Sequence, residues 1–124
     1  MIHKYNAKKT EFEGIQFPSK YEALVYSHLR RLEEAGEITK LERQITVVFF
    51  CQQLTKTRKN QITTIVDFVC VKDGVRVYIE ASGCITPIRA IKTKLWQYFI
   101  REPLIIYKGS ARGVPKIWKM ICCD

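Results

Sequence analysis

The 124-residue sequence lacks the features that mark membrane-spanning, secreted and zinc-binding proteins. No apolar run approaches the ~20 residues of a membrane-spanning helix, and residues 1–14 contain no apolar signal-peptide core. The five cysteines form no Cys-x-x-Cys pair, and two histidines are too few for a typical zinc site. No repeat, linker or low-complexity tract interrupts the chain. These absences predict one globular intracellular domain over residues 1–124, with reduced cysteines, no membrane partner and no small-molecule cofactor.

Acidic residues are scarce relative to basic ones. The chain has 21 Lys and Arg against 12 Asp and Glu, a net charge of +9. This excess favours an anionic partner, with nucleic acid the leading candidate, although a basic protein without such a partner has the same composition. Many of the cations gather in a basic N-terminal arm, residues 1–18, and in a polar loop expected over residues 52–61. The candidate DNA-binding residues, which are otherwise solvent-exposed cations, are Lys4, Lys8, Lys9, Lys56, Arg58 and Lys59.

The stretch VDFVCVKDGVRVYIEASG, residues 66–83, has a carboxylate near each end of a mostly apolar run. Asp73-Gly74 predicts a two-residue type I′ turn, because both positions of that turn need a positive φ. Counting outward from the turn places Asp67 directly opposite Glu80. Facing Cβ atoms of an antiparallel pair lie about 5 Å apart, so two carboxylates there need a cation or a shared proton. The hairpin therefore predicts a functional site.

Alternation divides this hairpin into an apolar face and a half-polar face. The apolar face is expected to pack on a helix and consists of Val66, Phe68, Cys70, Val77, Ile79 and Ala81. The other face is expected to point both acids away from the core and consists of Asp67, Val69, Val71, Arg76, Tyr78, Glu80 and Ser82.

Capping signals and periodicity predict two helices. Ser19 is an N-cap with Glu22 three positions later, a capping-box spacing that explains Glu22 equally well without any metal. The stripe of this first helix ends before Gly36 and consists of Tyr21, Leu24, Val25, His28, Leu29, Leu32 and Ala35. Thr86-Pro87 begins the second helix, whose expected inward stripe consists of Ile88, Ile91, Leu95 and Phe99.

The remaining pattern is that of strands. Strands are expected at residues 41–51, 62–71 and 75–81, followed after the second helix by the apolar segment 103–107, expected to be central and parallel to a neighbour. The last apolar segment, residues 114–123, is a strand or a short helix. The order predicts an α/β fold with a mixed central sheet flanked by helices.

Four segments resemble, in order and spacing, the PD-(D/E)XK nuclease superfamily and, more narrowly, small phage-encoded nucleases of uncertain role. They are FEGIQFPSKYEALVY, ERQITVVF, VDFVCVKDG and IEASGCITPIRAIKTKLW. The resemblance covers roughly residues 4–107. It implies a restriction-endonuclease-like core, a DNA substrate, Mg²⁺ or Mn²⁺ as cofactor, and the cytoplasm of a bacterial host cell as location.

The same resemblance implies residue roles. Asp67 and Glu80 would bind the metal with the backbone carbonyl of Ala81, and Glu22 would join directly or through water. The metal would supply an activated water and a stabilised leaving oxygen for phosphodiester hydrolysis. The sequence departs from the superfamily at Ser82, where a lysine is expected. Lys92 and Lys94 are the candidates to replace that lysine, with Lys94 slightly favoured, although both fit ordinary solvated helix positions.

The function expected from these patterns is a small metal-dependent DNA endonuclease. No base-reading motif is present, so we expect recognition of DNA structure, such as a branched junction, through phosphates. A homodimer that cuts two strands is expected by fold analogy. Two alternatives stay open: a DNA-binding protein of the same fold that has lost catalysis, and the nuclease subunit of a transposition complex.

Overall fold

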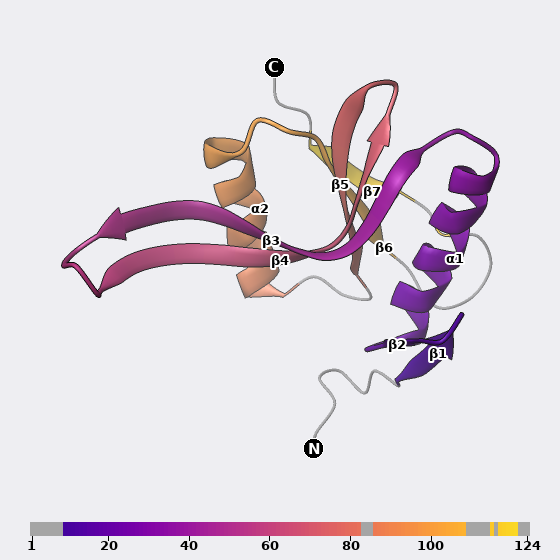
Figure 1. The fold of residues 1–124 in the computed structure, drawn as a ribbon, viewed down its shortest axis with the longest axis horizontal. Coiled ribbons are helices and arrows are strands. Elements are labelled where there is room, and N and C mark those ends of the chain that lie inside the picture. Colours follow the sequence, from indigo (N-terminus) through magenta and orange to yellow (C-terminus); the bar gives the residue numbers. More distant parts are fainter. Residues whose placement is uncertain (1–8, 83–85, 109–114, 116, 122–124) are drawn as a thin grey trace.

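The structure is a computed structural model that describes residues 9–82, 86–108, 115 and 117–121. Within these residues the chain forms two sheets and two helices (Figure 1). The elements are β1 (Thr10–Phe12), β2 (Ile15–Phe17), α1 (Lys20–Glu34), β3 (Thr39–Gln53), β4 (Lys59–Lys72), β5 (Val75–Ser82), α2 (Pro87–Phe99), β6 (Leu104–Lys108) and β7 (Ile117–Ile121). β1 and β2 pair with each other, and the larger sheet has the order β3-β4-β5-β6-β7. β5 and β6 are parallel and the other neighbours antiparallel, so the predicted mixed sheet is confirmed.

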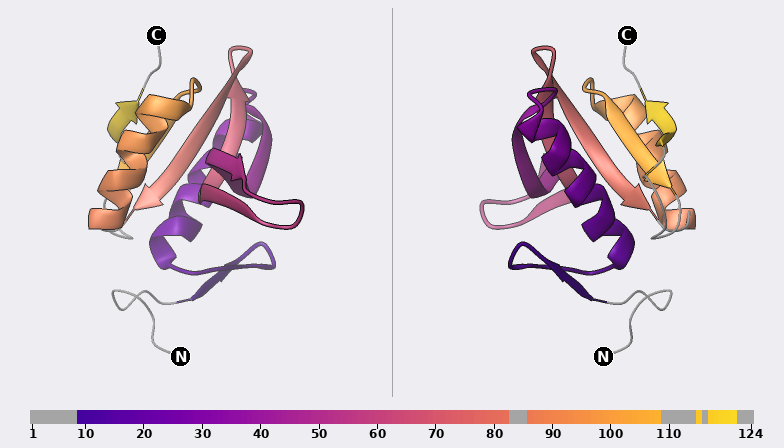
Figure 2. Two further views of the ribbon diagram at one scale, coloured as in Figure 1. Left: turned by 90° about the vertical axis from the view of Figure 1, so that its left-hand side faces the viewer. Right: turned by 90° about the vertical axis from the view of Figure 1, so that its right-hand side faces the viewer.

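The two helices cover opposite faces of the larger sheet (Figure 2). On one face, Val25 and Leu29 of α1 pack in a cluster with Phe68. On the other, Trp96 of α2 packs in a second cluster with Tyr78. The removal of these apolar side chains from water on both faces stabilises the sheet between the helices. The predicted α/β architecture is therefore confirmed.

Both helices begin where the capping signals predict. Ser19 Oγ accepts a hydrogen bond from the Glu22 backbone N–H at 3.1 Å, and Thr86 Oγ1 accepts one from the Arg89 N–H at 3.1 Å. The first helix ends before Gly36, whose φ of 80° only glycine adopts without strain. In the described part of the chain, no helix combines the length and apolarity needed to cross a membrane.

The β4–β5 hairpin has the predicted turn and register. Asp73 and Gly74 have φ values of 52° and 77°, as a type I′ turn requires. The strands pair from Lys72 opposite Val75 to Phe68 opposite Ile79, the register obtained by counting outward from the turn. The prediction that residues 103–107 form a strand parallel to a neighbour is also confirmed, because β6 pairs in parallel with β5.

β3 and β4 extend away from the rest of the fold as a long two-stranded segment, residues 45–66, which is called the ribbon below (Figure 1). Pairing continues to Gln53 opposite Lys59, so the loop predicted over residues 52–61 is shorter than expected and consists of residues 54–58. Residues 50–62 are all exposed, so this outer part of the ribbon needs no apolar alternation, and backbone pairing continues through its polar residues. Similarly, residues 10–17 of the predicted basic arm form the β1–β2 hairpin.

The side chains of β4 change face where the ribbon leaves the sheet. Phe68 packs in the cluster under α1, but Val66 belongs to the cluster under α2. Residues two positions apart share a face in a regular strand, so the alternation is broken between them, at Asp67. The prediction that Val66 lies on the same face as Phe68 is therefore wrong.

The paired strand β3 changes face at the same level. Ile45 packs with the α2 cluster, whereas Arg43 lies over the ring of Phe17 on the α1 side, 4.4 Å from its centroid. Gln44, between them, has a φ of 55°, an unusual conformation for a residue with a Cβ atom. This backbone distortion is the local cause of the change of face.

α2 faces the sheet with a different side from the one predicted. Ile88, Ile91 and Phe99 are 60%, 59% and 42% exposed, so their assignment to an inward stripe is wrong. Trp96 is instead buried, and its Nε1 donates a hydrogen bond to the Glu102 carbonyl at 2.8 Å. An indole buries more apolar surface than an isoleucine and here also satisfies its N–H, which explains why the helix is rotated toward Trp96.

Candidate active site

Asp67 lies at the point where β4 changes face, and it interacts with groups from both sides of the sheet. Its Oδ2 accepts a hydrogen bond from the Ala81 N–H at 2.9 Å, and the side chain is half-buried. Its negative charge acts on Glu22 of α1 and on Glu80 of β5. Three carboxyl groups that are far apart in sequence are thus brought together around Asp67.

Glu22, in the first turn of α1, is buried, with 5% of its surface exposed. Burial, followed by the charge of Asp67 and a hydrogen bond between the two carboxyl groups, raises the pKa of Glu22 to about 8, against a lowering effect of Arg43. Its Oε2 has no hydrogen-bond partner. A buried carboxyl group beside a second one favours a proton or a cation between them.

The helix cap does not compete with this arrangement. Ser19 caps the helix by accepting a hydrogen bond from the backbone N–H of Glu22, whereas the interaction with Asp67 uses the Glu22 carboxyl group. The structural role of Glu22 at the helix start and a chemical role of its side chain are therefore compatible.

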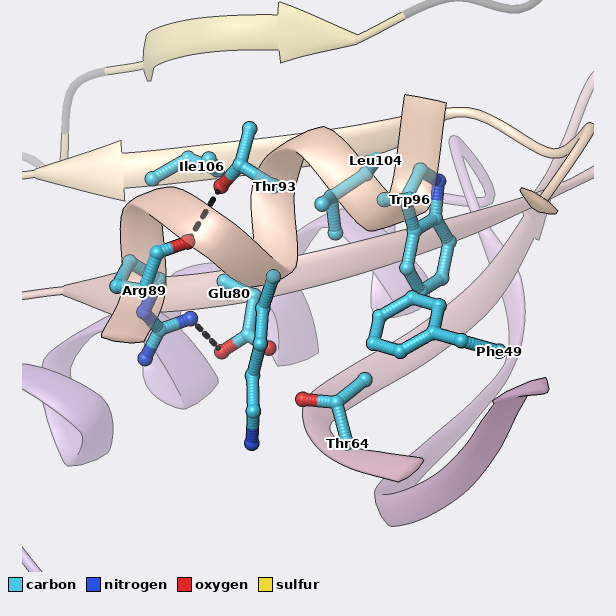
Figure 3. Close-up of a pocket in the computed structure, with 9 residues that line it drawn as sticks. Phe49, Thr64, Glu80, Arg89, Thr93, Trp96, Leu104 and Ile106 are labelled. Carbon is cyan, nitrogen blue, oxygen red and sulfur yellow. Dashed lines mark hydrogen bonds and ion pairs between the residues drawn. The ribbon is translucent and has the colours of Figure 1, made fainter. Parts of the chain in front are cut away.

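Glu80 lies between β5 and α2, with 4% of its surface exposed (Figure 3). Arg89 points at it from the first turn of α2, and Arg89 Nη1 lies 2.6 Å from Glu80 Oε2. The contact is a close ion pair, although Oε2 has no hydrogen bond of regular geometry. Burial and the charge of Asp67 raise the pKa of Glu80, and Arg89 opposes them.

This burial corrects the prediction that both acids point away from the core. Glu80 is enclosed because α2 covers the half-polar face of the hairpin, where Tyr78 and Trp96 form part of the second cluster. The sequence indicated a half-polar surface because it could not show that α2 supplies Arg89 to neutralise a buried carboxylate.

The two candidate lysines of α2 have different surroundings. Lys92 lines a small cavity of about 10 Å³ with Glu80, Arg89 and Thr93, whereas Lys94 is exposed and does not line it. A volume of this size is close to that of a single water molecule. The helix direction thus favours Lys92 over Lys94 as the residue nearer to the carboxylates.

A buried serine, Ser82, stands where the family resemblance leads one to expect a lysine. Ser82 is 3% exposed and is the register partner of Lys108 in the parallel β5–β6 pair. Alternation along β6 places Lys108 on the same face as Ile106, which packs in the α2 cluster. Lys108 is therefore a third candidate lysine on the α2 side of the sheet.

The carboxylates fit a divalent cation only in part. Among the described residues, no three His, Cys, Asp or Glu side chains stand in an arrangement that would hold a metal ion. Glu22 and Asp67 fit best, because Glu22 Oε2 is buried and unpaired beside Asp67. Glu80 is already paired with Arg89. Ala81 contributes its N–H to Asp67, and the role predicted for its carbonyl stays a prediction.

The candidate DNA-binding residues are spread over two ends of the molecule. Lys4 and Lys8 lie outside the described residues, and Lys9 is exposed just before β1. Lys56, Arg58 and Lys59 are exposed at the tip of the ribbon.

Two arginines near the carboxylates were missed by the sequence analysis. Arg89 lies three positions before Lys92, so the two share a helix face, but the apolar stripe of α2 indicated another face. Arg43 occupies a strand position that the alternation of β3 does not distinguish. A search for cations on every face of the predicted elements would have found both arginines, but it would not have shown that they lie near the carboxyl groups.

Comparisons with known proteins give one match. The model of a family described as "Protein of unknown function (DUF1064)" matches residues 2–110, most of the chain. Searches of curated proteins and of solved structures found no match. Because this model matches most of the chain, the chain belongs to the DUF1064 family.

Proposed function

We propose that this protein is a DNA endonuclease of the PD-(D/E)XK type that depends on Mg²⁺ or Mn²⁺. The observation that carries the proposal is the grouping of Glu22, Asp67 and Glu80, from α1, β4 and β5, around one end of the hairpin. Buried carboxyl groups that share a site are costly without a function or a neutralising partner. A restriction-endonuclease-like core is compatible with the mixed sheet between two helices.

A bound divalent cation would supply a polarised phosphate and a water of lowered pKa. Asp67 and Glu22 are the residues that would hold it, with Glu80 and the Ala81 carbonyl as further protein ligands. The Ala81 N–H orients the Asp67 carboxylate. Arg89, the cation paired with Glu80, would offset the charge of a phosphate there, a role in which Lys92 and Lys108 are alternatives.

The proposed substrate is DNA with structural features, such as a branched junction, in the cytoplasm of a bacterial host of a phage or mobile element. A net charge of +9 supports an anionic partner, and the described elements include no zinc finger or isolated groove-reading helix. A homodimer would bring two such sites to two strands.

The test is cleavage of supercoiled and branched DNA with Mg²⁺ or Mn²⁺. We expect the wild-type protein to nick these substrates and Asp67→Asn to be about 100-fold slower, because it removes a carboxylate at the centre of the site. Lys92→Met should slow cleavage, whereas Lys94→Met, the matched control on the same helix, should not. Equal rates for Asp67→Asn and wild type would contradict the proposed site.

One other function has a specific observation in its favour. The pairing of Glu80 with Arg89 and the serine at position 82 favour a DNA-binding protein without catalysis. Failure of the wild-type protein to cut with either metal, together with DNA binding, would support it. Cutting only after a partner protein is added would instead support the nuclease subunit of a transposition complex.

A further inference from the structure

The ribbon differs in charge from the rest of the chain. Residues 43–66 contain no aspartate or glutamate, whereas the remaining residues contain all 12. The cations of the ribbon are Lys56, Arg58 and Lys59, and all three are exposed at its tip. A projecting segment without acids does not repel a polyanion at any point along its length.

The tip is a defined turn rather than an unstructured loop. The backbone N–H groups of Leu54 and Thr55 both donate to the Arg58 carbonyl, at 2.9 and 3.0 Å. Gln53 Nε2 donates to the same carbonyl at 3.0 Å, and Thr55 Oγ1 accepts from the Arg58 N–H at 3.0 Å. These bonds fix the backbone that carries the basic side chains before any partner binds, which lowers the entropy lost on binding.

The base of the ribbon is fixed to α2. Phe49 meets Trp96 edge to face, with ring centroids 6.2 Å apart, and Phe50 lies 6.5 Å from Phe99. The ribbon therefore projects in one direction from the body that carries the carboxyl groups (Figures 1 and 2).

The outer part of the ribbon carries exposed amide side chains. Gln52 lies opposite Asn60, and Gln61 lies opposite Cys51, all of them exposed. Asn and Gln side chains can pair with base edges, and the major groove, about 12 Å wide, admits a two-stranded ribbon whose strands lie about 4.8 Å apart. Lysine and arginine at the tip complement the phosphates that border the groove.

We infer that the ribbon enters the major groove of duplex DNA and that Lys56, Arg58 and Lys59 contact phosphates beside it. The inference rests on the DNA partner of the proposed function but not on cleavage. From Lys59 to Asp67 the strand runs eight residues, roughly 26 Å at about 3.3 Å per residue. At about 3.4 Å per base pair, the tip contacts DNA within about eight base pairs of the carboxyl groups.

Binding to a 30-base-pair duplex in EDTA tests the inference separately from catalysis. The tip variant is Lys56→Ala/Arg58→Ala, and the matched control is Arg31→Ala/Lys72→Ala, which removes one arginine and one lysine that are exposed away from the ribbon. Loss of two phosphate contacts should reduce the slope of log affinity against log salt by about 2 and weaken binding roughly 30-fold at 0.15 M salt. The control should bind like wild type.

Two measurements examine the groove itself. Duplex DNA should slow alkylation of the exposed Cys51, followed by mass spectrometry of its peptide, while the buried Cys70 serves as the internal control. Wild-type protein should also protect guanine N7, a major-groove atom, from dimethyl sulfate, and the tip variant should not.

The outcomes separate the two proposals. No DNA binding by wild type overturns both the proposed function and this inference. Binding that the tip variant retains, or that leaves guanine N7 reactive, overturns the inference alone. Loss of self-association in the tip variant with unchanged DNA affinity would assign the ribbon to a second copy of this chain and would also overturn it.

Discussion

The two ends of strand β4 differ in charge and in surroundings. At Asp67 the strand is enclosed by α1 and β5, and carboxyl groups crowd together there. At Lys59 it is exposed on both faces and the neighbouring charges are all positive. Carboxyl groups are gathered where the fold excludes water, and cations where it does not, so the same strand links the proposed active site with the proposed DNA contact.

The boundary between these ends is the change of face at Gln44 and Asp67. A regular strand would have kept Asp67 on one face, near either Glu22 or Glu80. The broken alternation allows it to interact with both, which is how the fold concentrates the acids at one end. Changes at the enclosed end, around Asp67, should have larger effects than changes at the boundary, at Gln44.

The largest effect is expected from Arg89→Met. Removal of the guanidinium leaves the buried carboxyl of Glu80 without its ion-pair partner, and we expect the free energy of unfolding to fall by about 3 kcal/mol. Urea denaturation measures this loss. Glu80→Gln/Arg89→Met should recover most of the stability because it buries no charge. Similar stabilities of the single and double variants would show that the ion pair has little influence on folding.

A change of pH should have a smaller effect on stability, and this effect should arise from the carboxyl groups around Asp67. The pKa of Glu22 is about 8 in the folded protein, above the value of 4.5 for a free side chain, so the folded state binds this proton more tightly. Its stabilising effect is complete below about pH 4.5 and is lost as pH rises toward 8. We expect the Tm of the metal-free protein to fall by roughly 5 °C between pH 5 and pH 8.5.

Two controls sharpen this prediction. Glu22→Gln should reduce the fall of Tm and leave the part due to Glu80, whose pKa is also raised, whereas Lys56→Ala/Arg58→Ala at the other end of β4 should leave the fall unchanged. Mg²⁺ or Mn²⁺ should raise the Tm more at pH 8.5 than at pH 5, because binding requires ionised carboxylates. A metal effect that is the same at both pH values would argue against these carboxylates as ligands.

The smallest effect is expected at the boundary. Gln44→Val should lower the free energy of unfolding by about 1–2 kcal/mol, because a β-branched residue disfavours a φ of 55°. Gln44→Gly is the matched control and should be neutral or slightly stabilising. If the distortion positions Asp67, the valine variant should also lose cleavage activity under conditions where it is folded, as judged by circular dichroism. Full activity of the valine variant would separate the distortion from the site.

Signals between neighbours in sequence predicted much of the fold. Ser19 and Thr86 cap their helices, and Asp73-Gly74 forms its turn, because each depends on the conformational preference and hydrogen bonds of a few adjacent residues. The same local reasoning paired Asp67 with Glu80, the family resemblance added Glu22, and the structure brings the three together. Their metal-binding and catalytic roles stay predictions.

The rotation of α2 and the extent of the ribbon could not be predicted in this way. Of the predicted apolar stripe of α2, Ile88, Ile91 and Phe99 are exposed and only Leu95 packs against the second cluster. The face that contacts the sheet instead buries Trp96 and pairs Arg89 with Glu80. The ribbon continues through polar residues because its pairing depends on the backbone of another strand.

The sequence by itself determined where the helices and the tight turn begin, which strand pair carries the acids, and that the charge of the chain suits an anionic partner. Only the tertiary structure decided that Asp67 reaches both sheet faces, that Arg89 neutralises Glu80, and that the basic tip projects from the body. The reason is physical: caps and turns depend on neighbours in the chain, whereas the burial of a charge and the face of a distorted strand depend on groups that only folding brings into contact.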